Sequence, residues 1–146
     1  MKEYKVIVDS YGTRKWYRND KLHREDGPAV EFVSGSKEWW LNGQLHREDG
    51  PAYESVGGTK WWYLNGKRHR EDGPAVEGAY GNKYWYRNGK RHREDGPAIE
   101  WSNGDKEWYL NGEQLTQKQF NKRISGKELT VAEVERLLGH KVKIVK

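Results

Sequence analysis

The tetrapeptide His-Arg-Glu-Asp holds the residue types in this chain that could most readily do chemistry, and it occurs four times. Each copy begins the identical heptapeptide HREDGPA, and the four copies are His23–Ala29, His46–Ala52, His69–Ala75 and His92–Ala98. An imidazole and a carboxylate three residues apart, with a second carboxylate between them, could ligate a metal ion or act as an acid/base pair. A catalytic site, however, needs one asymmetric group of side chains, whereas four identical copies indicate a requirement for folding. We therefore expect no catalytic residue and no metal site.

We interpret the heptapeptide as a structural corner of the backbone. Its arginine can bridge to the neighbouring glutamate or to the aspartate two positions on, its glycine is expected to take an unusual backbone angle, and its proline sets φ. The residues predicted to form these corners are Arg24, Asp26, Arg47, Asp49, Arg70, Asp72, Arg93 and Asp95. Contacts of the same side chains with a ligand, once per copy, are the alternative. Because the chain also has no phosphate-binding loop, HExxH motif or activated-serine motif, we expect neither an enzyme nor a cofactor.

The corners recur every 23 residues, and other columns keep this period over about residues 4–112. One column is tryptophan throughout: Trp16, Trp39, Trp62, Trp85 and Trp108. A second column is asparagine, followed by glycine in every unit but the first: Asn19, Asn42, Asn65, Asn88 and Asn111. A fixed period of this length is the signature of a repeat architecture, so we predict a repeat array over residues 1–112.

Each repeat unit has the pattern of β structure. In the third unit an aromatic run at 60–64 precedes Asn65-Gly66, and strand-forming residues resume after it. Asn-Gly between such segments predicts a type I′ turn, in which both central residues have positive φ. After the corner, Val76 lies in an apolar column and Glu77 in an acidic one, which is the alternation of a strand. The predicted fold is mostly β: a single-layer antiparallel meander of stacked hairpins, each touching mainly its neighbours.

Residues 113–146 break the period and predict a small α/β cap made of helix, helix and strand. A capping box at Thr116 precedes a short amphipathic helix. A second capping box at Thr130 begins a helical stripe that ends at Gly139, and residues 140–145 alternate as a last strand. Because a stack of repeats needs a terminal element over its last unit, we expect a cap, with a partner-binding helix as the alternative.

Composition limits the class of protein. Apolar residues make up 34% of the 146 residues, but aromatic residues make up 13%, including 8 Trp, which argues against disorder. No apolar run approaches the roughly 20 residues that span a bilayer, and the N-terminus has no signal-peptide core. There is no cysteine for a disulfide or a thiolate site. The net charge of +5 is too mixed to indicate nucleic acid by itself. We expect a cytoplasmic protein that does not bind membranes.

The pattern W-Y-x-N-G-K-x-H-x-x-x-G-x-A at a period of 23 residues resembles the MORN repeat and its bacterial MORN-variant relatives. The HREDGPA form resembles the MORN-like proteins of phages and giant viruses, and residues 129–145 are similar to the endings of many small phage proteins. The resemblance implies an open array of β-hairpins that acts as a scaffold or binding surface, without implying one activity. Arg-Glu-Asp-Gly-Pro replaces a short Gly-x-Gly element of the usual repeat, so membrane roles suggested for eukaryotic MORN proteins are not carried over.

Positions at which the units differ are the candidates for binding, because the shared positions are needed for folding. The third and fourth units gain aromatic and basic side chains together. The predicted binding residues are Trp61, Lys67, Arg68, Tyr84, Arg87, Lys90 and Arg91. Residues 59–98 hold nine basic and five acidic side chains, whereas residues 13–52 hold seven of each. Positive charge interleaved with rings favours an anionic partner, and a merely solubilising face is the alternative.

These observations predict a non-catalytic, phage-encoded scaffold that binds and inhibits a host protein or protein complex with an acidic surface. A defence protein or a nucleic-acid-handling complex would be such a target, reached in the host cytoplasm. One alternative is the sequestration of a small phosphorylated nucleotide, or the binding of single-stranded nucleic acid, by stacking on Trp61 or Tyr84 between arginines. Saccharide binding by the stacked tryptophans is another. The first strand, Tyr4–Asp9, also leaves an edge that could pair with another copy.

Overall fold

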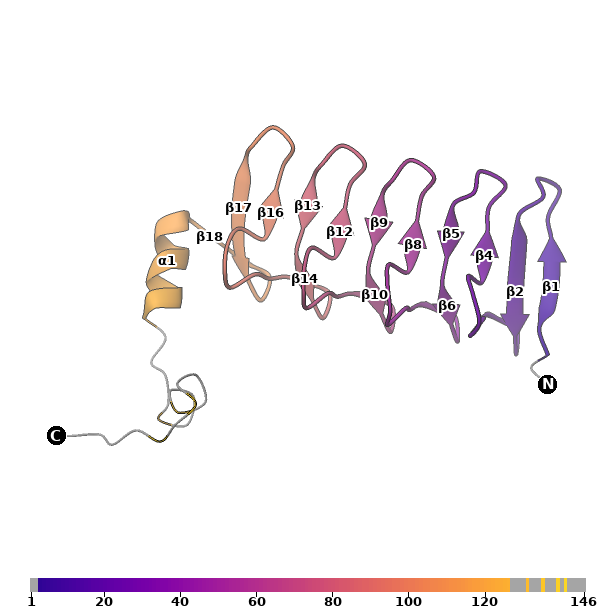
Figure 1. The fold of residues 1–146 in the computed structure, drawn as a ribbon, viewed down its shortest axis with the longest axis horizontal. Helices are drawn as coiled ribbons and strands as arrows, with labels where there is room; N and C mark the ends of the chain where they lie inside the picture. Colours follow the sequence, from indigo (N-terminus) through magenta and orange to yellow (C-terminus); the bar gives the residue numbers. More distant parts are fainter. Residues whose placement is uncertain (1–2, 127–130, 132–134, 136–138, 140, 142–146) are drawn as a thin grey trace.

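The structure is a computed structural model, and it describes residues 3–126 together with residues 131, 135, 139 and 141. A row of β-hairpins runs from the N-terminus to a C-terminal helix (Figure 1). The elements are β1 Lys5–Val8, β2 Arg14–Arg18, β3 Lys21–Leu22, β4 Val30–Glu31, β5 Lys37–Glu38, β6 Trp40–Leu41, β7 Gln44–Leu45, β8 Tyr53–Glu54, β9 Lys60–Trp61, β10 Tyr63–Leu64, β11 Lys67–Arg68, β12 Val76–Glu77, β13 Lys83–Tyr84, β14 Tyr86–Arg87, β15 Lys90–Arg91, β16 Ile99–Glu100, β17 Lys106–Leu110, β18 Glu113–Leu115 and α1 Gln117–Ser125.

Most of the strands belong to one antiparallel sheet. Within the described residues this sheet has twelve strands, in the order β1-β2-β4-β5-β8-β9-β12-β13-β16-β17-β18, with β3 paired to β2. The hairpins β6–β7, β10–β11 and β14–β15 form separate two-stranded sheets. Neighbours in the large sheet follow each other along the chain, and the sheet does not close into a barrel. The predicted mostly-β meander of stacked hairpins is confirmed.

One repeat unit consists of two hairpins and a corner, and the third unit illustrates it. Strands β8 and β9 pair in the large sheet, and the loop between them turns at Gly58, whose φ is +93°. Strands β10 and β11 then pair around Asn65 and Gly66, whose φ angles are +49° and +74°. Both central residues have positive φ at all five such turns, including Asn19-Asp20, as predicted for type I′ geometry.

Neighbouring units are joined by backbone hydrogen bonds that recur with the period. The Arg47 N–H donates to the Tyr63 carbonyl at 3.0 Å, and the Gly66 N–H donates to the Leu45 carbonyl at 2.9 Å. Equivalent bonds occur at 23-residue steps along the array. Each unit is therefore held mainly by the unit before it and the unit after it, which is the quasi-one-dimensional stacking expected of repeats.

Cross-strand pairing divides the side chains of the sheet between two faces, because paired residues of an antiparallel sheet share a face. Val76 pairs with Trp61 on one side and with Tyr84 on the other, and we call the side that carries them the aromatic face. Glu77 pairs with a lysine of each flanking strand, so charges alternate along the opposite side. We call that side the corner face, since the invariant tryptophans and the corners lie on it.

A thin core runs along the array rather than through one centre. One column of small residues is fully buried: Ala29, Ala52, Ala75 and Ala98. Ile99 is also fully buried and packs with Tyr109, whereas Ile7, in the same column of the first strand, is 39% exposed. Burial at one repeat position therefore depends on whether a unit lies on both sides of it.

Helix α1 covers the last hairpin, as predicted for the first part of the cap. Thr116 and Gln119 form a complete capping box, and Phe120 is only 5% exposed where the helix packs on β17 and β18. Arg123 donates two hydrogen bonds to the Glu113 carboxylate, at 2.6 and 2.8 Å. These contacts join the helix to the end of the array, where α1 follows β17 and β18 in the ribbon (Figure 1).

The remainder of the predicted cap stays a prediction. The second helix after Thr130 and the strand at 140–145 lie outside the described residues, apart from isolated positions. The hairpin β17–β18 ends at Leu115, three residues beyond the last residue of the predicted array. Residues 113–115, which the sequence pattern assigns to the cap, therefore belong to the last hairpin of the array.

We expect Ile99→Ala to lower the free energy of unfolding by about 2–5 kcal/mol, because it empties a fully buried position. The matched variant Ile7→Ala removes the same atoms from an exposed position and should cost less than about 1 kcal/mol. Urea unfolding followed by tryptophan fluorescence measures both changes. Equal losses would contradict the gradient of burial along this column.

Candidate functional site

The corner arginine makes the same three polar contacts in every copy of the heptapeptide. In the third copy, Arg70 Nε donates to Asp72 Oδ1 at 2.9 Å, and its Nη1 donates to the Pro74 carbonyl at 3.2 Å and to Glu77 Oε1 at 2.9 Å. Arg24, Arg47 and Arg93 repeat this arrangement. The Arg–Asp contact expected in the corner is present. The glutamate that the arginine reaches, however, belongs to the strand after the corner and is not its sequence neighbour.

The same guanidinium lies on the ring of the invariant tryptophan. Arg70 Cζ is 4.0 Å from the Trp62 ring centroid, and the other three copies have distances of 4.2, 3.9 and 3.9 Å. A cation over an indole face is attracted by the ring quadrupole, and this attraction grows when the pair is partly shielded from water. One face of each of these four rings is therefore in contact with its own chain.

The corner glycines are required for space and not for an unusual φ. We expected Gly73 and its equivalents to take an unusual backbone angle, and this was wrong: none of them has positive φ. A Cβ at Gly73 would instead stand 3.0 Å from Arg70 Cζ. The other three corner glycines have the same neighbour at 3.0–3.1 Å. A side chain at this position would make the guanidinium shift by a few tenths of an ångström.

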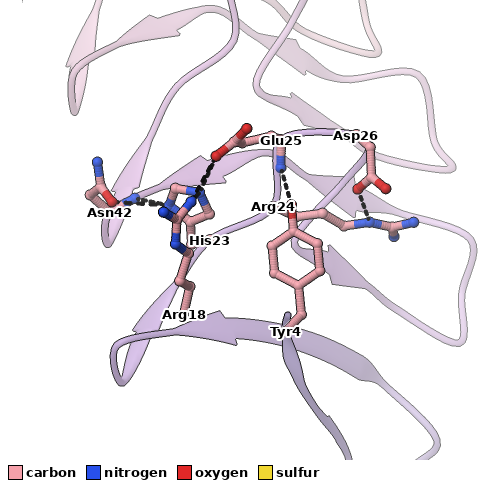
Figure 2. A network of polar contacts seen from close by, with 7 residues as sticks. All are labelled: Tyr4, Arg18, His23, Arg24, Glu25, Asp26 and Asn42. Carbon is pink, nitrogen blue, oxygen red and sulfur yellow. Dashed lines mark hydrogen bonds and ion pairs between the residues drawn. The ribbon is translucent and has the colours of Figure 1, made fainter. Parts of the chain in front are cut away.

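The corner histidines link one unit to the next. His23 Nδ1 accepts a hydrogen bond from the Asn42 backbone N–H at 3.0 Å, and its Nε2 lies 3.3 Å from Glu25 Oε1 (Figure 2). The other histidines hold the turn asparagine 19 residues on in the same way, in the pairs His46–Asn65, His69–Asn88 and His92–Asn111. In each of these four pairs the asparagine N–H is the donor and the histidine Nδ1 is the acceptor. Among the described residues, no group of three or more His, Asp or Glu side chains could hold a metal ion.

The predicted binding residues do not form one patch, because the structure divides them between the two faces. Trp61, Arg68, Tyr84 and Arg91 lie on the aromatic face, since Tyr63 pairs with Arg68 and Tyr86 pairs with Arg91. The remaining three, Lys67, Arg87 and Lys90, lie on the corner face. Arg87 there contacts two corner residues: its Nη1 is 3.4 Å from His92 Nε2 and its Nη2 is 3.3 Å from Glu71 Oε2.

On the aromatic face, arginine and tyrosine side chains alternate across the third, fourth and fifth units. Arg68 Nε donates to the Tyr63 hydroxyl at 3.0 Å, and its Cζ lies 5.4 Å from the Tyr86 ring centroid. Arg91 Nη1 donates to the Tyr109 hydroxyl at 3.1 Å, and its Nε reaches the Tyr86 hydroxyl at 3.4 Å. We call these five residues the arginine–tyrosine ladder. The hydrogen bond with Tyr86 raises the pKa of Arg91 above its usual value, so this charge is permanent.

Sequence reasoning missed the tyrosines of the ladder, because Tyr63, Tyr86 and Tyr109 belong to a column that is aromatic in every unit. The signal that separates the two faces was nevertheless present. A two-residue turn at Asn-Gly pairs the residue two before Asn with the residue two after Gly, and side chains alternate between faces along a strand. Applied to the fourth unit, this rule places Tyr86 with Arg91 and Arg87 with Lys90, on opposite faces.

Comparison with known proteins adds no assignment to this geometry. No known protein family matches the chain, and a search of curated proteins found no relative. Among the described residues, no helix is long and apolar enough to cross a membrane. The β-hairpin repeat is seen in the structure itself, and its finer resemblance to MORN-like proteins remains a prediction.

We expect Gly73→Ala to lower the free energy of unfolding by about 1–3 kcal/mol, because the added methyl group displaces the Arg70 guanidinium. In an Arg70→Ala background the same change should cost less than about 0.5 kcal/mol, since the clash is gone. A double-mutant cycle measured by urea unfolding gives both values. Additive losses would contradict the steric role of the arginine.

The corner aspartates should make stability depend on acid pH. Hydrogen bonds from Arg47, Arg70 and Arg93 hold the pKa values of Asp49, Asp72 and Asp95 below their ordinary value. A carboxylate whose pKa is lowered by folding stabilises the folded state near neutral pH, and this contribution is lost as the pH falls below about 4.

We therefore expect the triple variant Asp49→Asn/Asp72→Asn/Asp95→Asn to unfold at a lower Tm than the wild type at pH 7. Its Tm should also fall less between pH 5 and pH 2, because these three groups no longer titrate. Circular dichroism melts across this range, at constant salt, measure the difference. Parallel pH profiles for the two proteins would be inconsistent with the Arg–Asp contacts.

Proposed function

We propose that this protein is a non-catalytic scaffold that binds an acidic surface of a partner protein through the arginine–tyrosine ladder. The observation that carries the proposal is the fixed position of two permanent cations on successive repeat units. Arg68 and Arg91 occupy the same position in neighbouring units, and the hydroxyls of Tyr63 and Tyr109 hold one N–H of each. Two strands of the large sheet, at about 4.8 Å spacing, separate equivalent backbone positions of neighbouring units, so these positions are about 10 Å apart.

The remaining guanidinium N–H groups are available to a partner. The Nη1 and Nη2 groups of Arg68, and Nη2 of Arg91, donate to no other described residue. A guanidinium presents its donors as a planar fork that matches a carboxylate, and a fork already held in place loses little side-chain entropy on binding. Rings beside it add contact area, which is why Arg and Tyr are frequent among the residues that dominate protein interfaces.

Carboxylates limit the surface at both ends. The column that holds Trp61 and Tyr84 has Glu38 in the second unit and Glu107 in the fifth. Glu38 accepts from the Trp40 indole at 2.8 Å, and Glu107 accepts from the Tyr109 hydroxyl at 2.8 Å. An acidic partner would therefore be attracted to the third and fourth units and repelled by those beside them. The two glutamates that flank the basic units therefore determine where an acidic partner binds more than how tightly it binds.

Inhibition of a host protein in the host cytoplasm is the biological role that we propose for this surface. The support for that step is the resemblance of the HREDGPA array to MORN-like proteins of phages and giant viruses. No structural observation favours the other two hypotheses. Trp61 already packs on Tyr53, with ring centroids 4.4 Å apart, and the tryptophans of the corner face lie under arginines. Nucleotide and saccharide binding stay predictions from the sequence.

The test is recovery of a partner from bacterial lysate with an immobilised chain. We expect Arg68→Glu/Arg91→Glu to reduce recovery of the wild-type partner at least about tenfold, because each arginine would be an anchor that the bound partner covers. Lys67→Glu/Lys90→Glu is the matched control: it changes the charge equally, in the same two strands, on the opposite face. Quantitative mass spectrometry measures the recovery.

The proposal would be overturned if the two double variants recovered equal amounts of the partner. This holds whether both amounts match the wild type or both are reduced. Thermal melts must first show that both variants fold. Should the glutamates unfold the array, Arg68→Gln/Arg91→Gln removes the charges while keeping a donor for the tyrosine hydroxyls. Recovery of the partner that does not fall with salt would also contradict an electrostatic interface.

A further inference from the structure

The first strand of the array has an open edge. Among the described residues, β1 pairs with β2 and with no other strand. Three consecutive apolar side chains on it are exposed: Val6 by 49%, Ile7 by 39% and Val8 by 61%. An exposed apolar edge strand is a template for pairing with another strand, and proteins usually blunt such edges with charges, prolines or bulges. Val6, Ile7 and Val8, the last three residues of β1, carry none of these.

The backbone groups of two residues on this strand point outward. The Asp9 N–H donates to the Thr13 carbonyl, so residues 5, 7 and 9 face β2, and by alternation Val6 and Val8 face away from it. Val6 lies in the column of Ala29, whose carbonyl accepts the Trp16 N–H at 2.9 Å. The same bond recurs at each later step of the array. At Val6 no described residue supplies that donor.

We propose that β1 pairs with β1 of a second copy of this chain, antiparallel and centred on Ile7. In this register Val6 of each copy is opposite Val8 of the other. Because both residues point outward, each such pair exchanges two backbone hydrogen bonds. The two Ile7 side chains meet on the symmetry axis as a non-hydrogen-bonded pair. The result is a closed two-fold dimer in which the same edge is used by both chains.

Charge selects this register over its neighbours. With Ile7 at the centre, Lys5 of each copy stands opposite Asp9 of the other, which gives two pairs of unlike charges. Centring on Val6 would place Glu3 opposite Asp9, and these are like charges. Centring on Val8 would place Ile7 opposite Asp9 and leave Lys5 without an anion. Like charges directly opposite in a sheet are destabilising, and unlike charges are favourable.

The pairing also matches the faces of the two sheets. Side chains opposite each other in an antiparallel sheet share a face, so the aromatic face of one copy continues into that of the other. The two arginine–tyrosine ladders would then lie on the same side of one ribbon, with the α1 helices at its far ends. This arrangement would let one dimer bind a partner at two places, a consequence that rests on the proposed function, whereas the dimer itself does not.

The first test measures association against concentration by analytical ultracentrifugation. The interface is small, so we expect a dimer of twice the 17.2 kDa chain mass at about 100 µM and a monomer at about 1 µM. Val6→Pro should raise the concentration at which half of the chains are dimeric at least tenfold. The substitution removes an outward N–H without breaking a bond to β2. Val6→Thr keeps the N–H and is the matched control. A wild type that stays monomeric up to 1 mM would overturn the proposal.

The second test reads the register by disulfide formation, and the natural chain has no cysteine to interfere. In the proposed register Ile7→Cys places the two thiols on a non-hydrogen-bonded pair with Cα atoms about 4.5 Å apart, which is within disulfide range. Lys5→Cys places them roughly 13 Å apart. We expect oxidation to convert Ile7→Cys to a covalent dimer and to leave Lys5→Cys monomeric.

Equal cross-linking at both positions would show random collision and would overturn the register. Cross-linking at Val6→Cys but not at Ile7→Cys would overturn it as well, in favour of a shifted pair. These results are independent of the lysate experiment. A dimer that forms without a partner would support only the pairing of β1, and a partner bound by a monomer would support only the proposed function.

Discussion

The array depends on one interaction: the contact of each corner arginine with a tryptophan ring and a set of oxygen acceptors. In the third unit Arg70 joins three separated pieces of chain, since it touches Trp62 before the corner, Asp72 within it and Glu77 after it. A single-layer sheet buries few large apolar side chains, so it lacks the continuous core of a two-layer domain. A partly shielded guanidinium that is hydrogen-bonded on its edge and stacked on an indole supplies local order in its place. This contact accounts for the arginine, aspartate and glycine that all four copies of the heptapeptide share.

A second link acts between units. Each corner histidine holds the turn of the next unit by a backbone N–H, so the bend that the arginine sets in one unit determines where the next hairpin begins. Corner, tryptophan, turn and histidine together occupy the corner face. The aromatic face carries none of these shared polar contacts, and the columns of Trp61 and Arg68 on it differ from unit to unit. Positive charge and rings in the third and fourth units therefore change the surface without changing the stack.

The two ends of the array are built differently. At the C-terminal end, α1 covers the last hairpin with Phe120 and a paired Arg123. At the other end, β1 presents Val6, Ile7 and Val8 with outward backbone groups and no described covering element. A linear stack always has two terminal surfaces, and each must be covered by the chain, by solvent-compatible side chains or by another molecule.

The period of 23 residues, the positive φ at Asn-Gly, the meander and the first helix cap were all determined by the sequence alone, because each follows from local backbone rules. The alternation of side chains along a strand also places Arg87 and Arg91 on opposite faces. The tertiary structure alone decided that Arg68 meets Tyr86 of the next unit, that His46 holds Asn65, and that the corner glycine makes room for an arginine. Those contacts join residues that are distant in the chain or share a crowded corner. They depend on the bend between two hairpins, which no residue pattern specifies until neighbouring units are stacked.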